Sequence, residues 1–266
     1  MKNKISVILP TYNEKDNIVQ LIDELSDHLS RKEFEIIVVD DNSPDGTSLV
    51  VDDKKKNNKN VKLLCRTNKR GLTSALNNGI AIADGKIIVW MDCDFQMPPS
   101  VVSELVEKIE DGYDVAVGSR YVNGGKDLRY NQTIDHKLIT IVQTYLSLAI
   151  CRLTTYIFSS KQTDWTSGFI AIKRDIFDRI DLYGTYGEYF MYLIHHLENS
   201  GYKITEIPYT LGARMSGESK TSNGYVKMFI KGLKYIWAIL RLKLLDILYY
   251  SIYKKEPRYY DRSDAI

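Results

Sequence analysis

Short runs of β-branched and aliphatic residues alternate with amphipathic stretches through the first half of the chain, and this alternation restricts the fold more than any other feature. Several runs are apolar at every position, which is typical of parallel strands buried on both faces. Strands and helices that alternate at this spacing predict a doubly wound, mostly parallel α/β sheet. The predicted strands are Ile5–Leu9, Phe34–Val39, Val61–Cys65, Lys86–Met91 and Tyr113–Val117, and the predicted helices are Lys15–Leu29, Ser48–Lys56, Leu72–Ala83 and Pro99–Glu110.

The composition is close to the average for soluble globular proteins and excludes disordered and fibrous classes. The 266 residues are 44% hydrophobic and 26% charged, and the net charge of +2 gives no reason to expect nucleic-acid binding. Three irregularly spaced cysteines suit neither a disulfide framework nor a zinc site, and they favour a reducing compartment. No GxGxxG fingerprint follows the first strand, so an ordinary dinucleotide-binding domain is not expected.

The second half of the chain contains a long apolar stretch, Leu138–Phe158. Its length would allow it to cross a bilayer, but Gln143, Arg152 and several threonines interrupt it. A single crossing would also place Asp164–Gly168 on the opposite side of the membrane from Asp92, which is impossible if both serve one site. We therefore expect an interfacial or buried helix.

A second long helix is predicted over Tyr225–Tyr250, with a basic arc and an apolar arc. The basic arc holds Lys227, Lys231, Lys234 and Arg241, and the apolar arc holds Val226, Phe229, Ile230, Leu233, Trp237, Leu240 and Leu244. Two interpretations stay open: a surface helix that packs on the core, or a basic amphipathic helix that lies on an anionic membrane. Lysine and arginine interrupt the helix throughout, so we do not expect it to cross a membrane.

The strand Lys86–Met91 leads into two carboxylates one residue apart, Asp92 and Asp94, with Gln96 close behind. Ligands of open α/β sheets bind beyond the carboxyl ends of strands. This oxygen-rich set suits Mg²⁺ or Mn²⁺ and, through the metal, a nucleoside diphosphate. The structural alternative is an acidic pair that caps the helix starting near Pro98.

Two other predicted strands end in residues that suit a nucleotide. The first is followed by Thr11-Tyr12-Asn13-Glu14, and the second by Asp40-Asp41-Asn42-Ser43. An aromatic ring can stack on a base, and carboxylates can accept hydrogen bonds from ribose hydroxyls. Either asparagine taken alone is better explained as a helix cap. The coincidence of three strand ends favours a nucleotide site.

These segments resemble the family 2 inverting glycosyltransferases with the GT-A fold, and more narrowly the dolichyl-phosphate mannose synthase group, which includes polyprenyl-phosphate glucosyltransferases. The resemblance runs in order from about residue 4 to residue 240. It rests on Pro10–Glu14, Val38–Thr47, Gly71–Ala75, Asp92–Pro99, Gly118–Tyr121, Ser167–Phe169 and Gly217–Lys220. The QxxRW box of processive family 2 synthases is absent, so a polysaccharide polymerase is not expected.

The resemblance implies a GT-A catalytic domain over residues 1–222, with an interfacial helix over 133–159, and a C-terminal amphipathic membrane-associating helix and tail over 223–266. It also implies roles for individual residues. The nucleoside would contact Pro10, Tyr12, Glu14, Val39 and Asp41; the metal would bind Asp92, Asp94 and Gln96; and the backbone at Cys93 would approach the nucleotide. Phosphates would meet Arg120, Lys173, Arg214 and Lys220. An arginine that often precedes the long apolar helix of the family is replaced by His136 and Lys137, which are expected to bind the acceptor phosphate with Arg120.

The implied reaction is metal-dependent, inverting transfer of one sugar from GDP-mannose or UDP-glucose, with mannose favoured, to dolichyl or polyprenyl phosphate. The implied location is the cytoplasmic face of a membrane, where the protein would be peripheral. A lipid monophosphate is already a charged nucleophile near neutral pH, so Asp164 is expected to orient basic side chains. In a second interpretation the acceptor is a hydroxyl of a cell-surface glycan and Asp164 is the general base. A third is a non-catalytic, membrane-docked subunit that binds nucleotide sugars.

Overall fold

The computed structural model describes residues 3–129, 137–212, 214–215 and 225–253. Its strands and helices alternate as the sequence predicts. The first half contains β1 (Ile5–Thr11), α1 (Lys15–His28), β2 (Phe34–Asp40), α2 (Thr47–Asn57), β3 (Val61–Cys65), α3 (Leu72–Ala81), β4 (Ile87–Trp90), α4 (Val101–Glu110) and β5 (Val115–Ser119). The second half contains β6 (Lys126–Asp127), α5 (Lys137–Phe158), β7 (Ile170–Lys173), η3 (Arg174–Asp178), α6 (Glu188–Asn199), β8 (Ile204–Pro208), β9 (Thr210–Leu211) and α7 (Tyr225–Tyr253).

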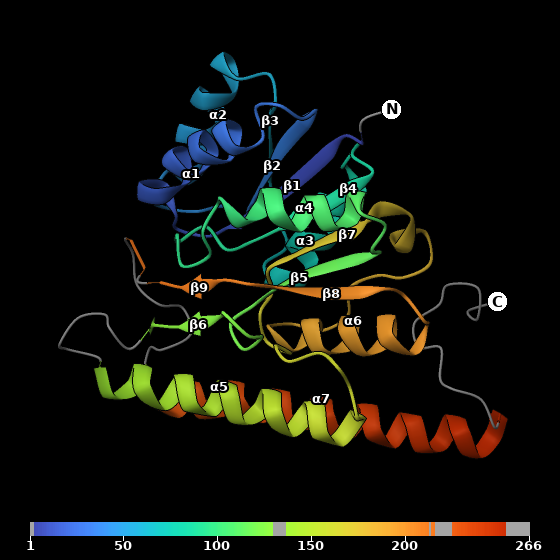
Figure 1. Ribbon diagram of the computed structural model, residues 1–266. Helices are drawn as coiled ribbons and strands as arrows, with labels where there is room; N and C mark the ends of the chain where they lie inside the picture. Colours follow the sequence, from blue (N-terminus) through green and yellow to red (C-terminus); the bar gives the residue numbers. More distant parts are fainter. Residues whose placement is uncertain (1–2, 130–136, 213, 216–224, 254–266) are drawn as a thin grey trace.

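The central sheet has the strand order β3–β2–β1–β4–β7–β5–β8. Neighbouring strands are parallel except where β7 pairs with β4 and β5. Helices α1, α2 and α4 contribute to the core on one face of the sheet, and α3 and α6 to the core on the other (Figure 1). The predicted doubly wound, mostly parallel sheet is confirmed. Strands β6 and β9 form a small parallel pair outside the central sheet.

The inner strands are apolar on both faces because both faces are covered by helices. In β1, Ile5, Val7 and Leu9 belong to the core beneath α1 and α4, whereas Ile8 belongs to the core beneath α3. Burying each such side chain contributes about 1.5–3 kcal/mol. Gly79 lets α3 lie close to the sheet, since a Cβ atom there would stand 2.5 Å from Ile8 Cγ2.

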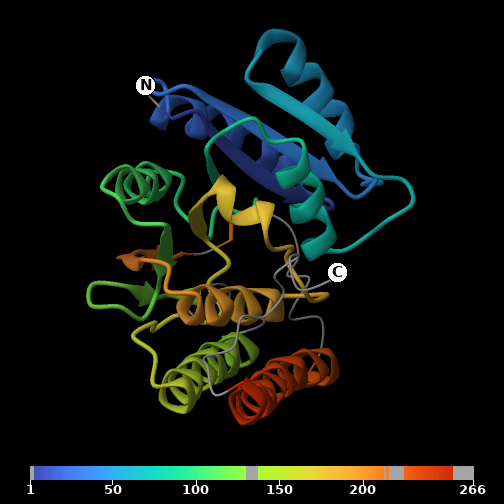
Figure 2. The same cartoon turned by 90° about the vertical axis from the view of Figure 1, so that its right-hand side faces the viewer.

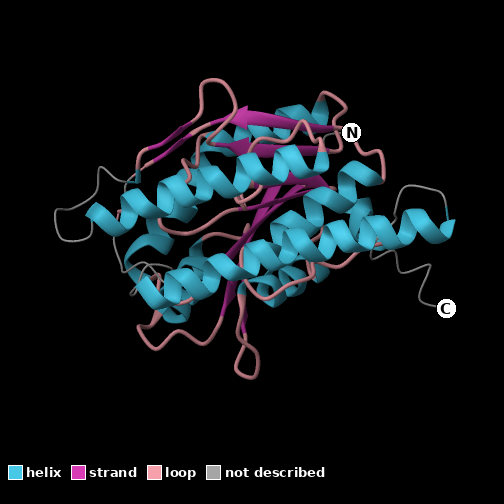
Figure 3. Ribbon diagram, turned by 90° about the horizontal axis from the view of Figure 1, so that it is seen from below, coloured by secondary structure: helices cyan, strands magenta, loops and turns pink. Residues whose placement is uncertain are grey.

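Helices α5 and α7 form an outer layer next to α6. Figure 2 shows α6 between the sheet and this pair, and Figure 3 shows the two helices running side by side. On α5 one side packs inward through the fully buried Cys151 and Thr154, while Tyr145, Leu153 and Tyr156 are exposed. By length and composition, Leu138–Phe158 is the only helix in the described ranges that could cross a membrane.

Helix α7 packs on the core through residues outside the predicted apolar arc. Its inward face is made by Ala238, Ile239 and Leu242, which are buried. The members of the predicted arc whose side chains the structure describes are each at least half exposed: Ile230, Leu233, Trp237, Leu240 and Leu244. The helix therefore packs on the core as the first interpretation expects, although not through this arc, and its binding to an anionic membrane stays a prediction. Unpartnered apolar side chains gathered on one helix face are typical of an interaction surface.

At the amino edge of the sheet a buried carboxylate joins three strands. Glu35 Oε1 accepts hydrogen bonds from Ser6 Oγ at 2.5 Å and from the Asp84 backbone N–H at 2.7 Å. Glu35 Oε2 lies 2.8 Å from Lys62 Nζ and 3.3 Å from Lys4 Nζ. Burial alone would raise the pKa of Glu35, but the hydrogen bonds from these four groups together lower it.

We expect Glu35→Gln to lower the free energy of unfolding by about 1–3 kcal/mol at pH 7, because the amide keeps the neutral hydrogen bonds and loses both ion pairs. The folded-state pKa of Glu35 lies below its ordinary value of 4.5. Its stabilisation is therefore present above that value and is lost as the pH falls through the folded-state pKa. Urea unfolding at pH 7 and pH 3 tests this, and a difference between wild type and variant that persists unchanged at pH 3 would contradict it.

Candidate active site

The carboxyl ends of β1, β2 and β4 lie along one edge of the sheet, because the three strands are parallel neighbours. Tyr12, Asp41 and Asp92 follow these strands directly or within two residues. The Cys93 thiol lies 3.6 Å from the Pro10 carbonyl oxygen, which joins the loops after β4 and β1. The structure therefore brings together the three strand ends singled out by the sequence.

Backbone strain gathers in the same three loops. Asn13, Asn42 and Phe95 have φ angles of 56°, 55° and 62°, in the left-handed region that L-residues rarely occupy. Asparagine tolerates this conformation, but phenylalanine does so at a cost of about 1–2 kcal/mol. Strained residues of this kind concentrate at functional sites.

The two carboxylates after β4 differ in environment. Asp92 is exposed, whereas Asp94 is only 3% exposed. Asp94 Oδ2 lies 2.7 Å from Arg214 Nη2, and Asp94 Oδ1 accepts a hydrogen bond from the Gln96 backbone N–H. Burial raises the pKa of Asp94, the Arg214 guanidinium opposes that shift, and the nearby negative charge of Glu14 adds to it.

The loop after β4 that carries Asp92, Asp94 and Gln96 is called the acidic loop below. Hydrogen bonds join it to the segment that carries Arg214. The Gly212 N–H donates to the Gln96 carbonyl, and the Gln96 side-chain amide donates back to the Gly212 carbonyl. The Met215 N–H donates to the Asp94 carbonyl at 3.1 Å. Two parts of the chain that are more than 110 residues apart thus form one unit. Lys220, predicted to act beside Arg214, lies outside the described residues.

The acidic loop offers carboxylate oxygens to a divalent cation that is also bound by substrate phosphates. Within the described ranges, no group of three or more His, Cys, Asp or Glu side chains could enclose a metal ion by itself. Mg²⁺ is usually held by one or two carboxylates together with substrate phosphates and water. Asp92 and Asp94 fit this pattern, with Gln96 two residues further on.

The expected nucleoside site contains two cations that the sequence analysis did not include. The Arg70 guanidinium lies 5.1 Å from the centre of the Tyr12 ring. Arg66 directly follows β3 and is ion-paired with Asp41, and the Gly71 N–H donates to the other oxygen of that carboxylate at 2.8 Å. The rule applied to the other strand ends would have identified Arg66, had it been applied to β3.

Val39 and Glu14, both predicted to hold the nucleoside, are buried to different degrees. The Val39 side chain is fully buried in the core that includes α3, so a contact between Val39 and a nucleoside stays a prediction for its backbone alone. Glu14 is 7% exposed and accepts a hydrogen bond from the Asn17 side chain. Its negative charge acts on Asp94, which places Glu14 beside the acidic loop.

Asp164 and Arg120 form a buried pair. Arg120 donates to Asp164 from its backbone N–H, from Nε at 2.8 Å and from Nη2 at 2.7 Å. Arg120 also donates to Thr166 Oγ1 and lies 3.5 Å from Asp127. Asp164 is fully buried and Arg120 is 5% exposed. In this arrangement the Arg120 guanidinium contacts the carboxylates of Asp164 and Asp127, and the predicted roles of Arg120 and Asp164 in the reaction stay predictions.

The loop that carries Asp164 is positioned from two further sides. Glu206, on β8, accepts hydrogen bonds from the backbone N–H groups of Thr163 and Asp164. Helix α5 contributes Cys151, whose thiol contacts Asp164 and Thr166. Burial, followed by the charge of Asp164, raises the pKa of Cys151 to about 12, so this group remains a thiol.

The structure separates Lys173, another predicted phosphate ligand, from this edge. Lys173 ends the antiparallel strand β7 and pairs with Ile87, the first residue of β4, so it lies at the opposite edge of the sheet. There it is 2.7 Å from Asp114. The prediction that Lys173 meets phosphates is therefore wrong. His136 and the side chain of Lys137 lie outside the described residues.

Comparison with known proteins identifies the fold and the family. The model for "Glycosyl transferase family 2" matches residues 6–181. The chain belongs to this family. Glucosyl-3-phosphoglycerate synthase from Mycobacterium tuberculosis, solved with Mn²⁺, UDP and phosphoglyceric acid, superposes with a TM-score of 0.65 at 20% identity, covering 91% of this chain and 78% of that one. The fold is thus of the GT-A type, as the resemblance implies.

Curated relatives of this family 2 chain share one kind of name. The dolichol-phosphate mannosyltransferase of Pyrococcus furiosus is 34% identical over 90% of this chain, which spans 64% of that relative's length. The dolichol-phosphate mannosyltransferase of Saccharomyces cerevisiae is 30% identical, with 89% of this chain and 88% of the relative covered. The polyprenol monophosphomannose synthase of Mycolicibacterium smegmatis is also 30% identical, with coverages of 83% and 82%.

We expect Asp164→Asn to destabilise this protein by about 3–5 kcal/mol, because it removes one partner of a buried ion pair. The double variant Arg120→Gln, Asp164→Asn should lose less than the sum of the two single variants. Denaturant unfolding measures both values. Near-complete loss of turnover with unchanged stability would instead indicate that Asp164 is a general base.

Proposed function

We propose that this protein transfers a single hexose, with mannose favoured and glucose possible, from a nucleotide sugar to a dolichyl or polyprenyl phosphate, with inversion. The observation that carries the proposal is the acidic loop after β4, which lies at the same sheet edge as Tyr12 and Asp41. The relatives named above support the mannose donor and the lipid phosphate acceptor.

The acidic loop accounts for departure of the nucleotide. When the sugar–diphosphate bond breaks, negative charge grows on the leaving nucleoside diphosphate. A divalent cation, Mg²⁺ or Mn²⁺, held by Asp92 and Asp94 would neutralise part of that charge. Gln96 would help to hold the ion, and structural neighbours solved with Mn²⁺ or Mg²⁺ and UDP support its use. Arg214 stands 2.7 Å from Asp94, within reach of phosphates bound there.

The residues at the other strand ends would hold the nucleoside. Tyr12 and Arg70 present a ring and a guanidinium stacked on each other, a surface on which a base can be placed. Arg66 and the Gly71 N–H fix the Asp41 carboxylate, so its position is set before ligand arrives. A preorganised carboxylate loses little entropy when it accepts a hydroxyl hydrogen bond.

The acceptor needs no base from the protein. A lipid monophosphate, with a second pKa of about 6, is largely dianionic at pH 7. The buried position of Asp164, with both oxygens engaged by Arg120, supports an orienting role and disfavours a hydroxyl acceptor. Arg120, His136 and Lys137 are proposed around the acceptor phosphate, with Arg120 acting through the loop that it holds.

A lipid acceptor requires contact with a membrane, and the outer layer provides a suitable surface. The side chains of Tyr156 on α5 and of Leu240 and Leu244 on α7 are apolar and exposed, and the two helices run side by side (Figure 3). The inward contacts of α5 keep that helix on the domain, so we propose peripheral attachment at the cytoplasmic face through both helices. The catalytic domain over 1–222 and the membrane-associating segment over 223–266 remain predictions.

We expect Asp92→Asn and Asp94→Asn each to lower sugar transfer at least about 100-fold, because each removes a charge that the diphosphate-bound cation needs. Transfer from GDP-mannose and UDP-glucose to polyprenyl phosphate is measured in detergent with Mg²⁺ or Mn²⁺. The matched control is Asp111→Asn, at a surface carboxylate just beyond α4 that should leave turnover unchanged. Full activity of the two acidic-loop variants would refute the proposed function.

We expect Leu240→Glu combined with Leu244→Glu to weaken binding to anionic vesicles at least about tenfold, since each exposed leucine would bury its side chain in the interface. Co-sedimentation with vesicles measures the partition. Leu49→Glu is the control, because Leu49 is 74% exposed on α2, on the other side of the sheet. Equal loss in the control, or no loss in the double variant, would show that α7 does not mediate membrane binding.

A further inference from the structure

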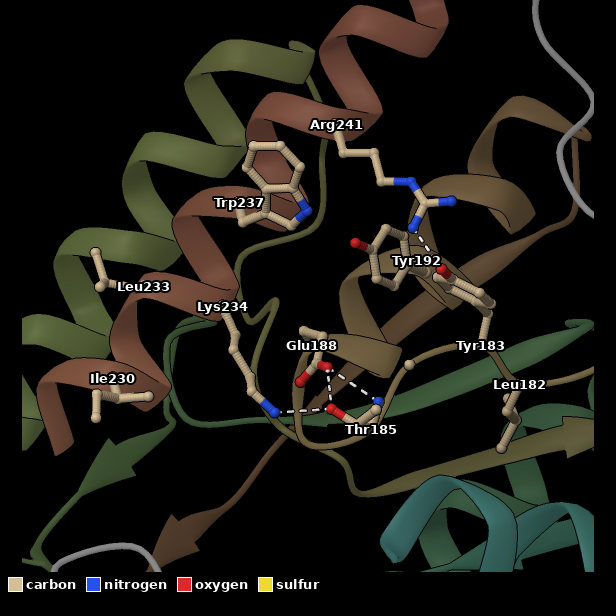
Figure 4. A pocket seen from close by; sticks show the side chains of 11 residues that line it. Leu182, Tyr183, Thr185, Glu188, Tyr192, Ile230, Leu233, Lys234, Trp237 and Arg241 are labelled. Carbon is tan, nitrogen blue, oxygen red and sulfur yellow. Dashed lines mark hydrogen bonds between the residues drawn. The ribbon is translucent and has the colours of Figure 1, made fainter. Parts of the chain in front are cut away.

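A groove of about 620 Å³ opens between the loop Leu182–Thr185, the start of α6 and the side of α7. Its size lies in the range of small-molecule sites. Figure 4 shows Glu188 and Lys234 extending into it from opposite walls, with Trp237 further along α7. None of the motifs that carry the family resemblance lies in this groove.

Glu188 holds a buried carboxylate oxygen that has no hydrogen-bond partner. The residue lines the groove and is only 7% exposed. Its Oε1 atom accepts two hydrogen bonds from Thr185, one from the backbone N–H and one from Oγ1, both at 3.0 Å. Within the described part of the chain its Oε2 atom has no hydrogen-bond partner. A carboxylate oxygen buried without a donor is destabilising, so the site is suited to a ligand that donates.

Lys234 supplies the complementary group. Its ammonium donates to Thr185 Oγ1 at 2.8 Å. An ammonium has three N–H donors, and this bond uses one of them. Lys234 and Glu188 form no ion pair with each other among the described residues; they meet through the Thr185 hydroxyl, which accepts from the lysine and donates to the carboxylate.

The Thr185 hydroxyl shows which chemistry fits the remaining sites. A hydroxyl can accept from Lys234 and donate to Glu188 at the same time. A phosphate could accept from the ammonium, but at neutral pH it has few protons to offer the carboxylate. A ligand with several hydroxyls would satisfy both groups, and Trp237 gives it an apolar ring face to lie against.

Tyr189 links the start of α6, which lines the groove, to the end of β4, two residues before Asp92. Glu188 precedes Tyr189, whose hydroxyl accepts a hydrogen bond from Trp90 Nε1 at 2.8 Å at the end of β4. The negative charge of Asp92 helps to raise the pKa of Tyr189, second to the effect of burial. A sugar attached to a diphosphate at Asp92 is therefore the nearest source of hydroxyls that the proposed function provides.

We propose that Glu188 and Lys234 form a hydroxyl-binding subsite for the hexose of the nucleotide sugar. The inference rests on the proposed function and extends it to the recognition of the sugar. The two residues determine how much affinity the sugar adds to that of the nucleoside diphosphate.

The test compares binding of GDP with GDP-mannose, and of UDP with UDP-glucose, each with Mn²⁺. Trp237 is the one exposed tryptophan of the three, so its fluorescence reports occupancy of the groove. We expect Glu188→Gln and Lys234→Gln each to lower the affinity for the preferred nucleotide sugar about tenfold or more, and that for the nucleoside diphosphate less than twofold. The glutamine at 188 can still accept from Thr185, so folding should be kept.

Glu198→Gln is the matched control on the same helix. The Glu198 carboxylate does not line the groove, and it accepts a hydrogen bond of 2.6 Å from Ser160 Oγ. Equal affinities of wild type and Glu188→Gln for the sugar nucleotide would overturn the inference and leave the proposed function standing. If wild type binds no nucleoside diphosphate, the proposed function fails. In that case titration with methyl α-mannoside and methyl α-glucoside decides the inference, which is overturned if neither changes Trp237 fluorescence in wild type.

A lipid headgroup is the other source of hydroxyls. Vesicles of phosphatidylglycerol, which carries a diol, are compared with vesicles of phosphatidic acid, which does not. We expect Glu188→Gln to bind both as wild type does. A loss restricted to phosphatidylglycerol would assign the groove to lipid headgroups and would overturn the inference.

Discussion

Parallel pairing of β2, β1 and β4 determines where this chain can perform chemistry. Each strand is hydrogen-bonded along its length to its neighbour, so the residues that follow them emerge together. Because both faces of the sheet are covered, the loops at this edge are where polar groups can gather without displacing the core. The strained backbone of Asn13, Asn42 and Phe95 shows that these loops are held in shapes dictated by the site rather than by local preference.

Helix α5 connects this site to the lipid-facing side of the molecule. Ser147, Cys151 and Thr155 recur every four residues and so lie on one stripe of the helix. Ser147 is hydrogen-bonded to Tyr121 and lies 3.0 Å from Thr166 Oγ1, and Thr155 contacts the Gln162 carbonyl. The opposite side of α5 is apolar and exposed. The same helix therefore positions the Asp164 loop and presents an apolar surface to the outside. This explains why a helix that is long and apolar enough to cross a membrane carries hydroxyls and a thiol at regular spacing.

Much of the fold follows from the sequence because strand burial and helix amphipathicity are local patterns. All five strands predicted in the first half are present. Strand β4 begins one residue later than predicted, at Ile87, and β5 begins two residues later, at Val115. The direction of β7 could not be predicted in this way, because an apolar run looks the same in a parallel and an antiparallel strand. Since β7 runs antiparallel to β4, its last residue, Lys173, lies at the sheet edge opposite to the acidic loop.

The parts of the candidate site that directly follow strand ends could be predicted from the sequence. Contacts between side chains from distant segments could not. Asp92 and Asp94 stand out as a pair in the sequence, but the ion pair that Asp94 forms with Arg214 joins it to a distant segment. Arg120 looks like a phosphate ligand in a motif, and its three hydrogen bonds to Asp164 could not be predicted from that motif. Pairings of this kind connect positions over 40 residues apart, which spacing alone cannot predict.

Helix α7 shows how one element can serve both substrates of the proposed reaction. Leu240 and Leu244 are exposed, whereas Lys234 reaches Thr185 at the start of α6. A helix seated on a membrane by its apolar face would hold Lys234 at a fixed height above the lipid, next to the loop that precedes Glu188. Sugar recognition and access to the lipid phosphate would then share one rigid support. Lys234 is consequently better explained as part of the sugar site than as a member of a basic stripe for anionic lipids, although the helical wheel groups it with that stripe.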